Sequence, residues 1–401
     1  MDDSFPRLLF FTSEIPQSRN AGSMQLFRAL QDYPGDRLRV IGPELAPGAT
    51  GLPCPYRTRR LGIYRLVNTR FRAWVTGINA LDLWPEPGLG RTLAAVEDFQ
   101  PDLVVTVMDH LSYYKHAWKL ARHLGAGLVT ITMDDPQTFE VAHRWLQGAY
   151  DRVLSHIYQS TALSLGVSRE MCDYLAEKFG RTSTPFYFGP PSGLRWRPAA
   201  DSLQLRDPSR LTLAYAGSLG LGYRDGILAL LPALEATGTD LQVYSHYRDV
   251  ITHPRIVNRG FLPPEDLWAA VQRDCDAVLL PYAYAGDILN LYRTHFPTKL
   301  SEYCWTGMPM LLSGPALATG IRWGQRHPEC ALVATDPGVD ACGPLLRRLR
   351  DDPELRRRLA AGSAAMAQTE FDPATVRRRF ADLMRQARDC HHGAPAHPAA
   401  G

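Results

Sequence analysis

The sequence lacks the signatures of several common classes of protein. No apolar run reaches the roughly 18 residues that a membrane-spanning helix needs. The N-terminus is acidic and leads directly into a strand-like run, unlike a secretory signal peptide. A net charge of +3 on 401 residues argues against a general nucleic-acid binder. We therefore predict a cytoplasmic protein that binds no nucleic acid.

Motifs for metal, dinucleotide and nucleophilic sites are missing too. The seven cysteines show no CxxC or Cys/His ligand spacing, and we interpret them as free thiols of a reducing compartment. Neither half of the chain has GxGxxG after its first strand, and no P-loop or Gly-x-Ser-x-Gly sequence occurs. These absences argue against dinucleotide-binding, P-loop and serine-hydrolase functions.

Short apolar, β-branched runs alternate with helical patterns along the chain, which is typical of parallel sheets covered by helices on both faces. The strands expected in the first half are Leu8–Thr12, Leu38–Ile41, Leu103–Val107, Leu128–Thr132 and Ala162–Val167, and the helices are Ser23–Leu30, Lys115–His123 and Arg169–Phe179. The strands expected in the second half are Leu211–Ala216, Leu241–Tyr244, Ala277–Pro281, Met310–Leu312 and Ala331–Ala334. The helices expected there are Asp225–Glu235, Pro264–Arg273, Thr298–Trp305, Pro344–Arg350 and Pro353–Thr369. We predict an α/β protein of two doubly wound, Rossmann-like domains.

A proline-rich segment, Pro185–Pro198, separates the two halves. We predict an N-terminal domain over residues 1–187, a linker over 188–198 and a C-terminal domain over 199–372. Residues 373–390 are predicted to form a helix that packs back on the N-terminal domain. Residues 391–401, rich in Ala, Pro and His, are predicted to be a disordered tail. Open parallel sheets bind ligands at the carboxyl ends of their strands, so the site is expected between the domains at those edges.

A glycine-rich turn follows the first strand of the second half. Tyr215–Arg224 reads YAGSLGLGYR and precedes a helical pattern. Its glycines let a ligand approach the backbone, and the helix N-terminus favours an anion. Arg224 adds a guanidinium suited to phosphate. The alternative interpretation is a flexible strand-to-helix turn.

The segment Phe296–Pro309, FPTKLSEYCWTGMP, is more informative. Thr298 is expected to cap a helix, and Glu302 falls in its first turn, where the helix dipole favours an acid. Glu302 is also well placed to accept the two hydroxyl hydrogen bonds of a ribose. Gly307 ends the helix before the next strand.

Taken in order, Gly217–Arg224, Leu280–Tyr282 and Phe296–Pro309 resemble the donor domain of GT-B-fold glycosyltransferases. The similarity is greatest to the large retaining group of bacterial polysaccharide and glycoconjugate synthesis. It covers most of Leu211–Leu312, and the N-terminal half only loosely. It implies two Rossmann-like domains facing each other across a cleft, with the acceptor on the N-terminal domain. It also implies a hexosyltransferase-like enzyme that moves a sugar from a nucleotide-diphosphate sugar to an acceptor, with retention, and with neither a cofactor nor a required metal.

The resemblance assigns roles to matching positions. Glu302 would bind the ribose, Gly217–Gly220 and Arg224 the diphosphate, and Lys299 would add a second cation beside the leaving group. The donor-binding residues implied are Gly22, Gly217, Ser218, Leu219, Gly220, Arg224, Tyr282, Thr298, Lys299, Leu300 and Glu302. The catalytic residues implied are Asp134, Asp135, Arg224 and Lys299, with the two aspartates near the reacting sugar. His110, Arg65 and Arg72 are the acceptor-side candidates.

Three positions depart from the family pattern. Thr294 stands where the family has the first of two Glu, and Asp287 is the alternative carboxylate nearby. Ser218 replaces an Arg, and Met133 a His. These departures keep open a non-catalytic nucleotide-binding relative. A nucleotide-sugar 2-epimerase on the same fold is a third hypothesis, for which the residues offer no clear acid–base set.

Two further features each have two interpretations. Ala46–Leu81 contains six Arg and no Asp or Glu. In one interpretation, its part Arg57–Trp74 contacts either the inner face of a membrane or an anionic acceptor. In the other, it forms a helix whose basic face is solvated. Asp134-Asp135 either binds a metal or supplies a helix cap at Asp135-Pro136, and we predict no metal.

Overall fold

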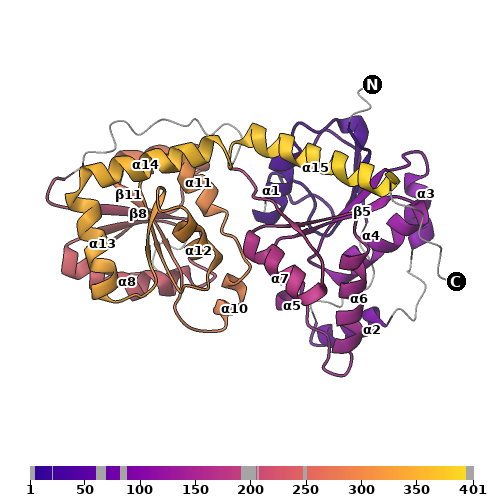
Figure 1. Ribbon diagram of the computed structural model, residues 1–401, viewed down its shortest axis with the longest axis horizontal. Helices are drawn as coiled ribbons and strands as arrows, with labels where there is room; N and C mark the ends of the chain where they lie inside the picture. The colour runs from indigo at the N-terminus through magenta and orange to yellow at the C-terminus, as the bar shows by residue number, and fades with distance from the viewer. Residues whose placement is uncertain are drawn as a thin grey trace. The chain divides into compact units, whose positions relative to one another are not determined.

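The computed structural model describes residues 5–19, 21–59, 69–81, 88–190, 205, 207–246 and 251–393. The chain divides into two compact units. Unit 1 contains Met1–Phe188 together with Ala374–Gly401, and unit 2 contains Gly189–Pro373. Each unit has a parallel sheet with helices packed on it (Figure 1).

Within the described residues, unit 1 has a seven-stranded parallel sheet in the order β3-β2-β1-β4-β5-β6-β7. Its strands are β1 (Leu8–Phe11), β2 (Leu38–Gly42), β3 (Tyr56–Thr58), β4 (Leu103–Val107), β5 (Gly127–Thr132), β6 (Leu163–Gly166) and β7 (Thr184–Pro185). The central strands are buried along their whole length because helices cover both faces. The order reverses between β1 and β4, which creates a crevice at their carboxyl ends.

The helices of unit 1 are α1 (Ala21–Leu30), α2 (Arg72–Ala80), α3 (Leu89–Val96), α4 (Leu111–Leu124), α5 (Pro136–Phe139), α6 (Gln147–Gln159), α7 (Arg169–Phe179) and α15 (Pro373–Gly393), with a 3-10 turn at Gly35–Arg37. Although α15 comes from the end of the chain, it packs on this unit. Its buried side chains recur on one face, and Arg377 pairs with Asp32. Arg379 Nη2 also donates to the carbonyl of Pro185 at 2.9 Å.

The described part of unit 2 has a six-stranded parallel sheet in the order β10-β9-β8-β11-β12-β13. Its strands are β8 (Thr212–Ala216), β9 (Asp240–Tyr244), β10 (Ile256–Asn258), β11 (Ala277–Pro281), β12 (Met310–Ser313) and β13 (Ala331–Ala334). Its helices are α8 (Tyr223–Thr237), α9 (Pro264–Asp274), α10 (Ile288–Tyr292), α11 (Lys299–Thr306), α12 (Thr319–Arg326), α13 (Val339–Asp351) and α14 (Pro353–Gln368).

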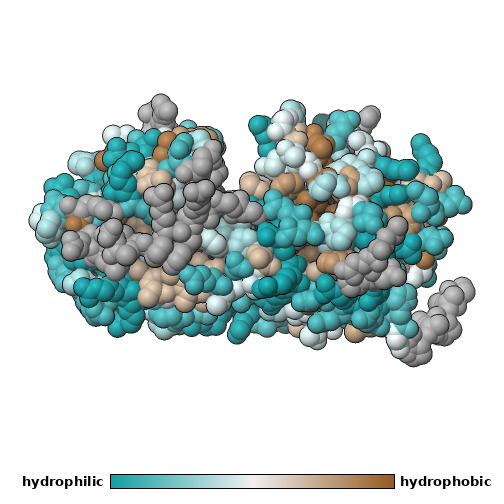
Figure 2. All heavy atoms as spheres, turned by 90° about the horizontal axis from the view of Figure 1, so that it is seen from above, coloured by the Kyte–Doolittle hydropathy of each residue, from teal (hydrophilic) through white to brown (hydrophobic). Residues whose placement is uncertain are grey.

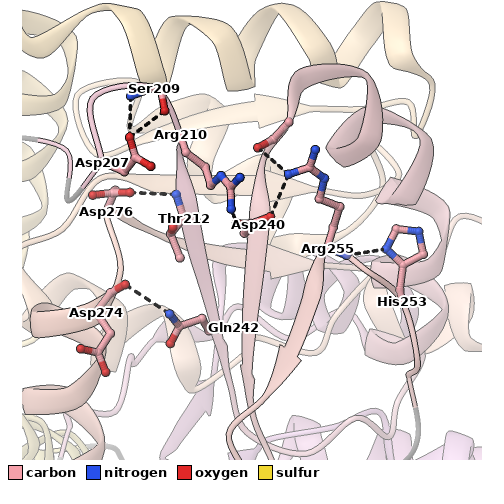
Figure 3. Close-up of polar contacts among 11 residues, drawn as sticks. Asp207, Ser209, Arg210, Thr212, Asp240, Gln242, His253, Arg255, Asp274 and Asp276 are labelled. Atoms are coloured by element: carbon pink, nitrogen blue, oxygen red, sulfur yellow. Dashed lines mark hydrogen bonds and ion pairs between the residues drawn. The ribbon is translucent and has the colours of Figure 1, made fainter.

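Polar side chains tie together the amino ends of the unit 2 strands (Figure 3). Asp240, at the start of β9, accepts from Arg210 at 3.0 Å and from Arg255 at 3.2 Å. Asp276 Oδ2 accepts from the backbone N–H of Thr212 at 2.8 Å. This edge is therefore held by partners within the protein, and the opposite, carboxyl edge is the one that presents the glycine-rich turn.

The predicted fold class is confirmed, and most elements fall where the sequence places them. Leu103–Val107, Ala277–Pro281, Ala331–Ala334 and Arg169–Phe179 match residue for residue. The last of these has clear end signals, since Ser168 Oγ accepts from the N–H of Met171 and Gly180 takes the left-handed conformation at φ 63°.

Two local predictions are wrong. Pro344 does not begin a helix but lies inside α13, because Cys342, Leu346 and Leu349 bury one continuous helical face that starts earlier. The predicted tail is helical at its start, where His391 Nε2 lies 3.1 Å from the carbonyl oxygen of Gly125. Residues 394–401, and most of the predicted linker, lie outside the described residues.

Candidate functional site

The turn after β8 forms a tight backbone curve at the carboxyl edge of unit 2. Gly217 has φ 125°, and Leu221 and Gly222 follow with φ 54° and 77°. A side chain with a Cβ is strained at these angles, most of all at Gly217. Neighbouring side chains hold this turn in place.

Two tyrosines brace the turn. The hydroxyl of Tyr292 in α10 donates to the carbonyl of Leu221 at 2.6 Å. A Cβ at Gly222 would lie less than 3.0 Å from that hydroxyl, so only glycine fits there. The hydroxyl of Tyr215 donates to the carbonyl of Ser218. The turn is thus fixed by side chains from β8 and α10 before any ligand binds.

Lys299 lies against the start of this turn, although 82 positions separate it from Gly217 (299 − 217). A Cβ at Gly217 would come within 3.0 Å of Lys299 Cε. The ammonium lies 4.0 Å from the ring centre of Tyr223 and 5.7 Å from that of Tyr215. Burial lowers the pKa of Lys299 to about 8, and Glu302 partly offsets this. A half-buried cation is therefore held beside a glycine-rich turn.

Glu302 lies one turn further along α11, three residues after Lys299 and partly exposed. The expected cap by Thr298 is wrong, because Thr298 has helical backbone angles and makes no capping hydrogen bond. Its carbonyl instead accepts from Ser301 Oγ at 2.9 Å. The start of α11 is anchored elsewhere, through Tyr303 Oη, which accepts from the N–H of Ala216 at 3.1 Å.

The other donor-side residues divide into exposed and buried groups. Ser218, Gly220 and Arg224 are exposed, and Arg224 Nη1 lies 3.8 Å from a carboxylate oxygen of Asp225. The buried group is Leu219, Leu300 and Tyr282. Tyr282 is enclosed by three glycines: Gly226, Gly314 and Gly320. These buried side chains belong to the packing that supports the turn and α11.

The two positions discussed for the missing family carboxylate differ in accessibility. Thr294 is buried just after α10, and its N–H donates to the carbonyl of Leu291 at 3.2 Å. Asp287 is exposed at the start of α10. Asp287 is therefore the more accessible of the two to a ligand.

Unit 1 has a pocket of about 180 Å³ at the carboxyl ends of β1, β4 and β5, where the strand order reverses. Its polar lining is acidic, and the residues that line it are Glu14, Gly22, Val107, Met108, Asp109, Met133, Asp134, Asp135 and Pro136. The predicted residues Gly22, Asp134 and Asp135 are thus brought together. No group of three or more His, Cys, Asp or Glu in the described chain is arranged to hold a metal ion.

Glu14 occupies the amino end of α1. Its Oε1 accepts from the N–H of Ser23 at 2.7 Å and from Ser23 Oγ at 2.6 Å. A Cβ at Gly22 would lie 3.3 Å from the same oxygen. A carboxylate from the protein therefore already meets the helix dipole, beside Gly22, which the resemblance assigns to donor binding.

Asp109 and His110 are neighbouring titratable groups at the end of β4. Asp109 accepts from Ser13 Oγ and, at 2.7 Å, from the N–H of His110. Burial raises the pKa of Asp109 to about 6, while His110 and Ser13 oppose this and Glu14 adds to it. Burial alone would lower the pKa of His110, but Glu140, 3.9 Å away, and Asp109 raise it overall.

Asp135 serves as a helix cap, as one of its two interpretations predicts. Its Oδ1 accepts from the N–H of Gln137 at 3.1 Å, with Pro136 at the first helical position. Its Oδ2 accepts from Tyr174 Oη at 2.7 Å and lies 3.8 Å from Lys178 Nζ. Asp134 lines the pocket.

The two remaining acceptor-side predictions concern arginines. Arg72 is exposed on α2 and is not among the residues that line the pocket. Arg65, with residues 60–68 of the basic stretch, lies outside the described residues.

Comparison with models of known protein families gives no match. Part of the chain is similar to the lipopolysaccharide core biosynthesis glycosyltransferase LpsD of Rhizobium meliloti, with 35% identity over 104 residues. That match spans 25% of this chain and 29% of LpsD. The likeness is local.

Solved structures match over nearly the whole chain. HepE of Anabaena, in complex with UDP and glucose, is 15% identical with a TM-score of 0.63, covering 94% of this chain and 99% of that one. Sucrose-phosphate synthase of Thermosynechococcus elongatus is 16% identical with a TM-score of 0.64, covering 94% and 98%. A glycosyltransferase of Rickettsia africae is 9% identical with a TM-score of 0.60, covering 95% and 97%. The chain has the GT-B fold.

Three residues that shape the candidate site were not identified by the sequence analysis: Glu14, Asp109 and Tyr292. Glu14 and Asp109 directly follow β1 and β4, so the rule that picked out His110 also applies to them. Tyr292 had no sequence signal, because its role depends on α10 folding beside the β8 turn.

Proposed function

We propose that the protein is a glycosyltransferase that transfers a sugar from a nucleoside-diphosphate sugar to a hydroxyl acceptor. Unit 2 would bind the nucleotide and its diphosphate, and the unit 1 pocket would hold the acceptor or the sugar. HepE, which shares the fold, was captured with UDP and glucose, and the local relative LpsD is a glycosyltransferase.

The observation that carries the proposal is the Lys299 ammonium held against Gly217. Among the described residues it has no carboxylate within ion-pair distance, and its neighbours are the rings of Tyr215 and Tyr223. An incoming diphosphate would supply the missing anion in a place of low dielectric, where the attraction is strong. The same charge would stabilise the diphosphate as it leaves.

Transfer would break the bond between the anomeric carbon and the diphosphate oxygen and form one to the acceptor oxygen. As the resemblance implies retention, the departing diphosphate would take the acceptor proton. Asp109 and Asp134 would accept hydrogen bonds from hydroxyl groups in the unit 1 pocket. The carboxylate content of that pocket suits a polyhydroxylated acceptor or sugar better than an anionic one.

Turnover of nucleotide sugars tests the proposal. Each of UDP-glucose, GDP-mannose and dTDP-glucose is incubated with wild type, and released nucleoside diphosphate is measured with and without an oligosaccharide acceptor mixture. Lys299→Gln should lower release by about a hundredfold or more, as for other groups that stabilise a leaving oxyanion. Arg273→Gln removes an exposed cation at the end of α9 and is the matched control.

The alternative outcomes lead to different functions. If Lys299→Gln releases nucleoside diphosphate as fast as wild type does, the assignment of the donor site to Lys299 and the β8 turn is contradicted. Conversion of the nucleotide sugar into an isomer without release indicates an epimerase. Binding of nucleotide without any turnover indicates a non-catalytic relative.

A further inference from the structure

The helix α2 turns its large apolar side chains outward. Phe71, just before the helix, is followed by Trp74, Ile78 and Leu81 at steps of three, four and three residues, which places all of them along one stripe. All are exposed, Phe71 by 53%. The buried residues of α2 are small ones: Thr76, Gly77 and Ala80.

The loop between α5 and α6 widens this stripe. Trp145 is 71% exposed and lies edge to face with Trp74, with ring centres 5.9 Å apart. His143 stacks on Trp74 at 4.0 Å, and its N–H donates to the carbonyl of Ala73 at 2.8 Å. Val141 is exposed as well. We call six residues the apolar surface: Phe71, Trp74, Ile78, Leu81, Val141 and Trp145.

Single exposed apolar residues are common, but their concentration here calls for a cause. Of the 11 large hydrophobic residues exposed in the described chain, six belong to the apolar surface. Within unit 1, α2 lies at the edge opposite α15 (Figure 1). On the side of unit 1 that carries α15, hydrophilic and hydrophobic residues are mixed (Figure 2).

Arginine side chains lie beside the apolar surface. The guanidinium of Arg70 lies 4.8 Å from the ring centre of Phe71, and that of Arg144 lies 5.5 Å from Trp145. Arg72 is exposed on α2. Ala46–Leu81 has no acidic residue, and Glu140, beside the loop, is buried. Aromatic rings and cations therefore share one face, and within the described residues 69–81 and 140–146 no carboxylate is exposed there.

We propose that the apolar surface, with Arg70, Arg72 and Arg144, binds an anionic lipid bilayer. Trp favours the boundary between headgroups and acyl chains because its ring is apolar and its N–H polar. Arg is attracted by anionic headgroups. In the described chain no helix is both long and apolar enough to cross a membrane, and attachment through this face lies on the surface of the bilayer. A protein partner would need matching acidic groups, whereas an anionic membrane supplies them at any orientation.

Sedimentation with vesicles tests the proposal without any nucleotide, so it does not depend on the function proposed above. The full chain is mixed with vesicles of phosphatidylcholine alone, or of phosphatidylcholine with phosphatidylglycerol. We expect binding to the anionic vesicles that weakens as salt is added. Trp145→Ala should weaken it about tenfold or more. Each of Arg70→Gln and Arg144→Gln should weaken it about fivefold.

The matched control is Phe261→Ala in unit 2. Phe261 is 53% exposed, like Phe71, but it stacks on His246 instead of lying on α2. The side chains changed are exposed, and thermal unfolding of each variant checks the fold. No binding by wild type overturns the proposal, as does equal loss in Phe261→Ala and Trp145→Ala. If wild type does not bind vesicles but forms a dimer that Trp145→Ala disrupts, the membrane proposal is overturned in favour of a contact between two copies of the chain.

Discussion

The Cε atom of Lys299 occupies the space that a Cβ at Gly217 would fill, within 3.0 Å of it. This relationship joins two segments distant in sequence, the turn after β8 and the start of α11. It explains why a glycine is needed at position 217 beyond its backbone angle. It also places a cation of lowered pKa beside the glycine-rich turn.

Gly217→Ala should weaken nucleotide binding, with at least a tenfold loss of affinity by calorimetry. The new methyl group meets both an unfavourable φ of 125° and the Lys299 side chain. Gly286→Ala is the control, because Gly286 has φ 97° but nothing within 4 Å of its Cβ position. Equal effects of the two variants would mean that backbone strain alone is responsible.

Affinity for nucleoside diphosphate should fall as the pH rises through about 8. The unbound protein loses the Lys299 proton near that pH, so binding above it requires proton uptake. The fall approaches tenfold per pH unit between about pH 8 and 9, where the diphosphate itself no longer titrates. Lys299→Gln should bind nucleoside diphosphate weakly, and its affinity should not fall between pH 8 and 9. A wild-type affinity that is flat across this range contradicts the role given to Lys299.

The KM for the acceptor should fall as the pH rises through about 6. Asp109 ionises there, because burial raises its pKa, and only the carboxylate accepts hydrogen bonds at both oxygens. Asp109→Asn should remove this dependence and raise KM at pH 7. Asp98→Asn is the control, since Arg39 lowers the pKa of Asp98 to about 2, outside the range tested. Initial rates at varied acceptor concentration give the values.

Asp276→Ala should destabilise unit 2 while leaving nucleotide affinity unchanged. The change leaves the N–H of Thr212 without its 2.8 Å acceptor, at a cost of about 1–3 kcal/mol. Asp276→Asn keeps an acceptor oxygen and should recover most of the stability. Asp274→Ala removes the ion pair with the exposed Arg273, worth about 1 kcal/mol or less. Urea unfolding distinguishes these three, and an altered affinity would mean that this edge communicates with the site.

The configuration of the product tests the expectation of retention. NMR of the anomeric proton should show the same configuration as in the donor sugar. An inverted product would require a base on the protein, and Asp109 or His110 would be the groups to examine.

The strand and helix pattern predicted the fold because buried parallel strands are apolar throughout, as in Leu103–Val107 and Ala277–Pro281. Boundaries were accurate where a cap stands, as at Ser168 and Gly180. They failed at Pro344, because tertiary burial of the helix face outweighed the helix-breaking tendency of a single proline.

Local structure at the candidate site was predictable only where one segment carries its own signal. The turn at Gly217 and the place of Glu302 in the first turn of a helix were predicted from the sequence, but the bracing by Tyr292 depends on a contact between distant segments. Glu14 at the start of α1 is similar, since nothing in the sequence shows that it reaches Ser23. The sequence did not show that the apolar stripe of α2 faces outward, because the same periodicity occurs in any amphipathic helix.

A thermal-unfolding panel with UDP, GDP, dTDP and CDP tests the central claim, that unit 2 binds a nucleoside diphosphate. Wild type is compared with Glu302→Ala and with Glu354→Ala, an exposed acid in the first turn of α14. Ligand at about a hundred times its dissociation constant should stabilise wild type by about 2.7 kcal/mol. The account predicts that one of the four nucleotides stabilises wild type. The same stabilisation should be seen in Glu354→Ala and should be absent in Glu302→Ala. No stabilisation of wild type by any of the four would contradict it.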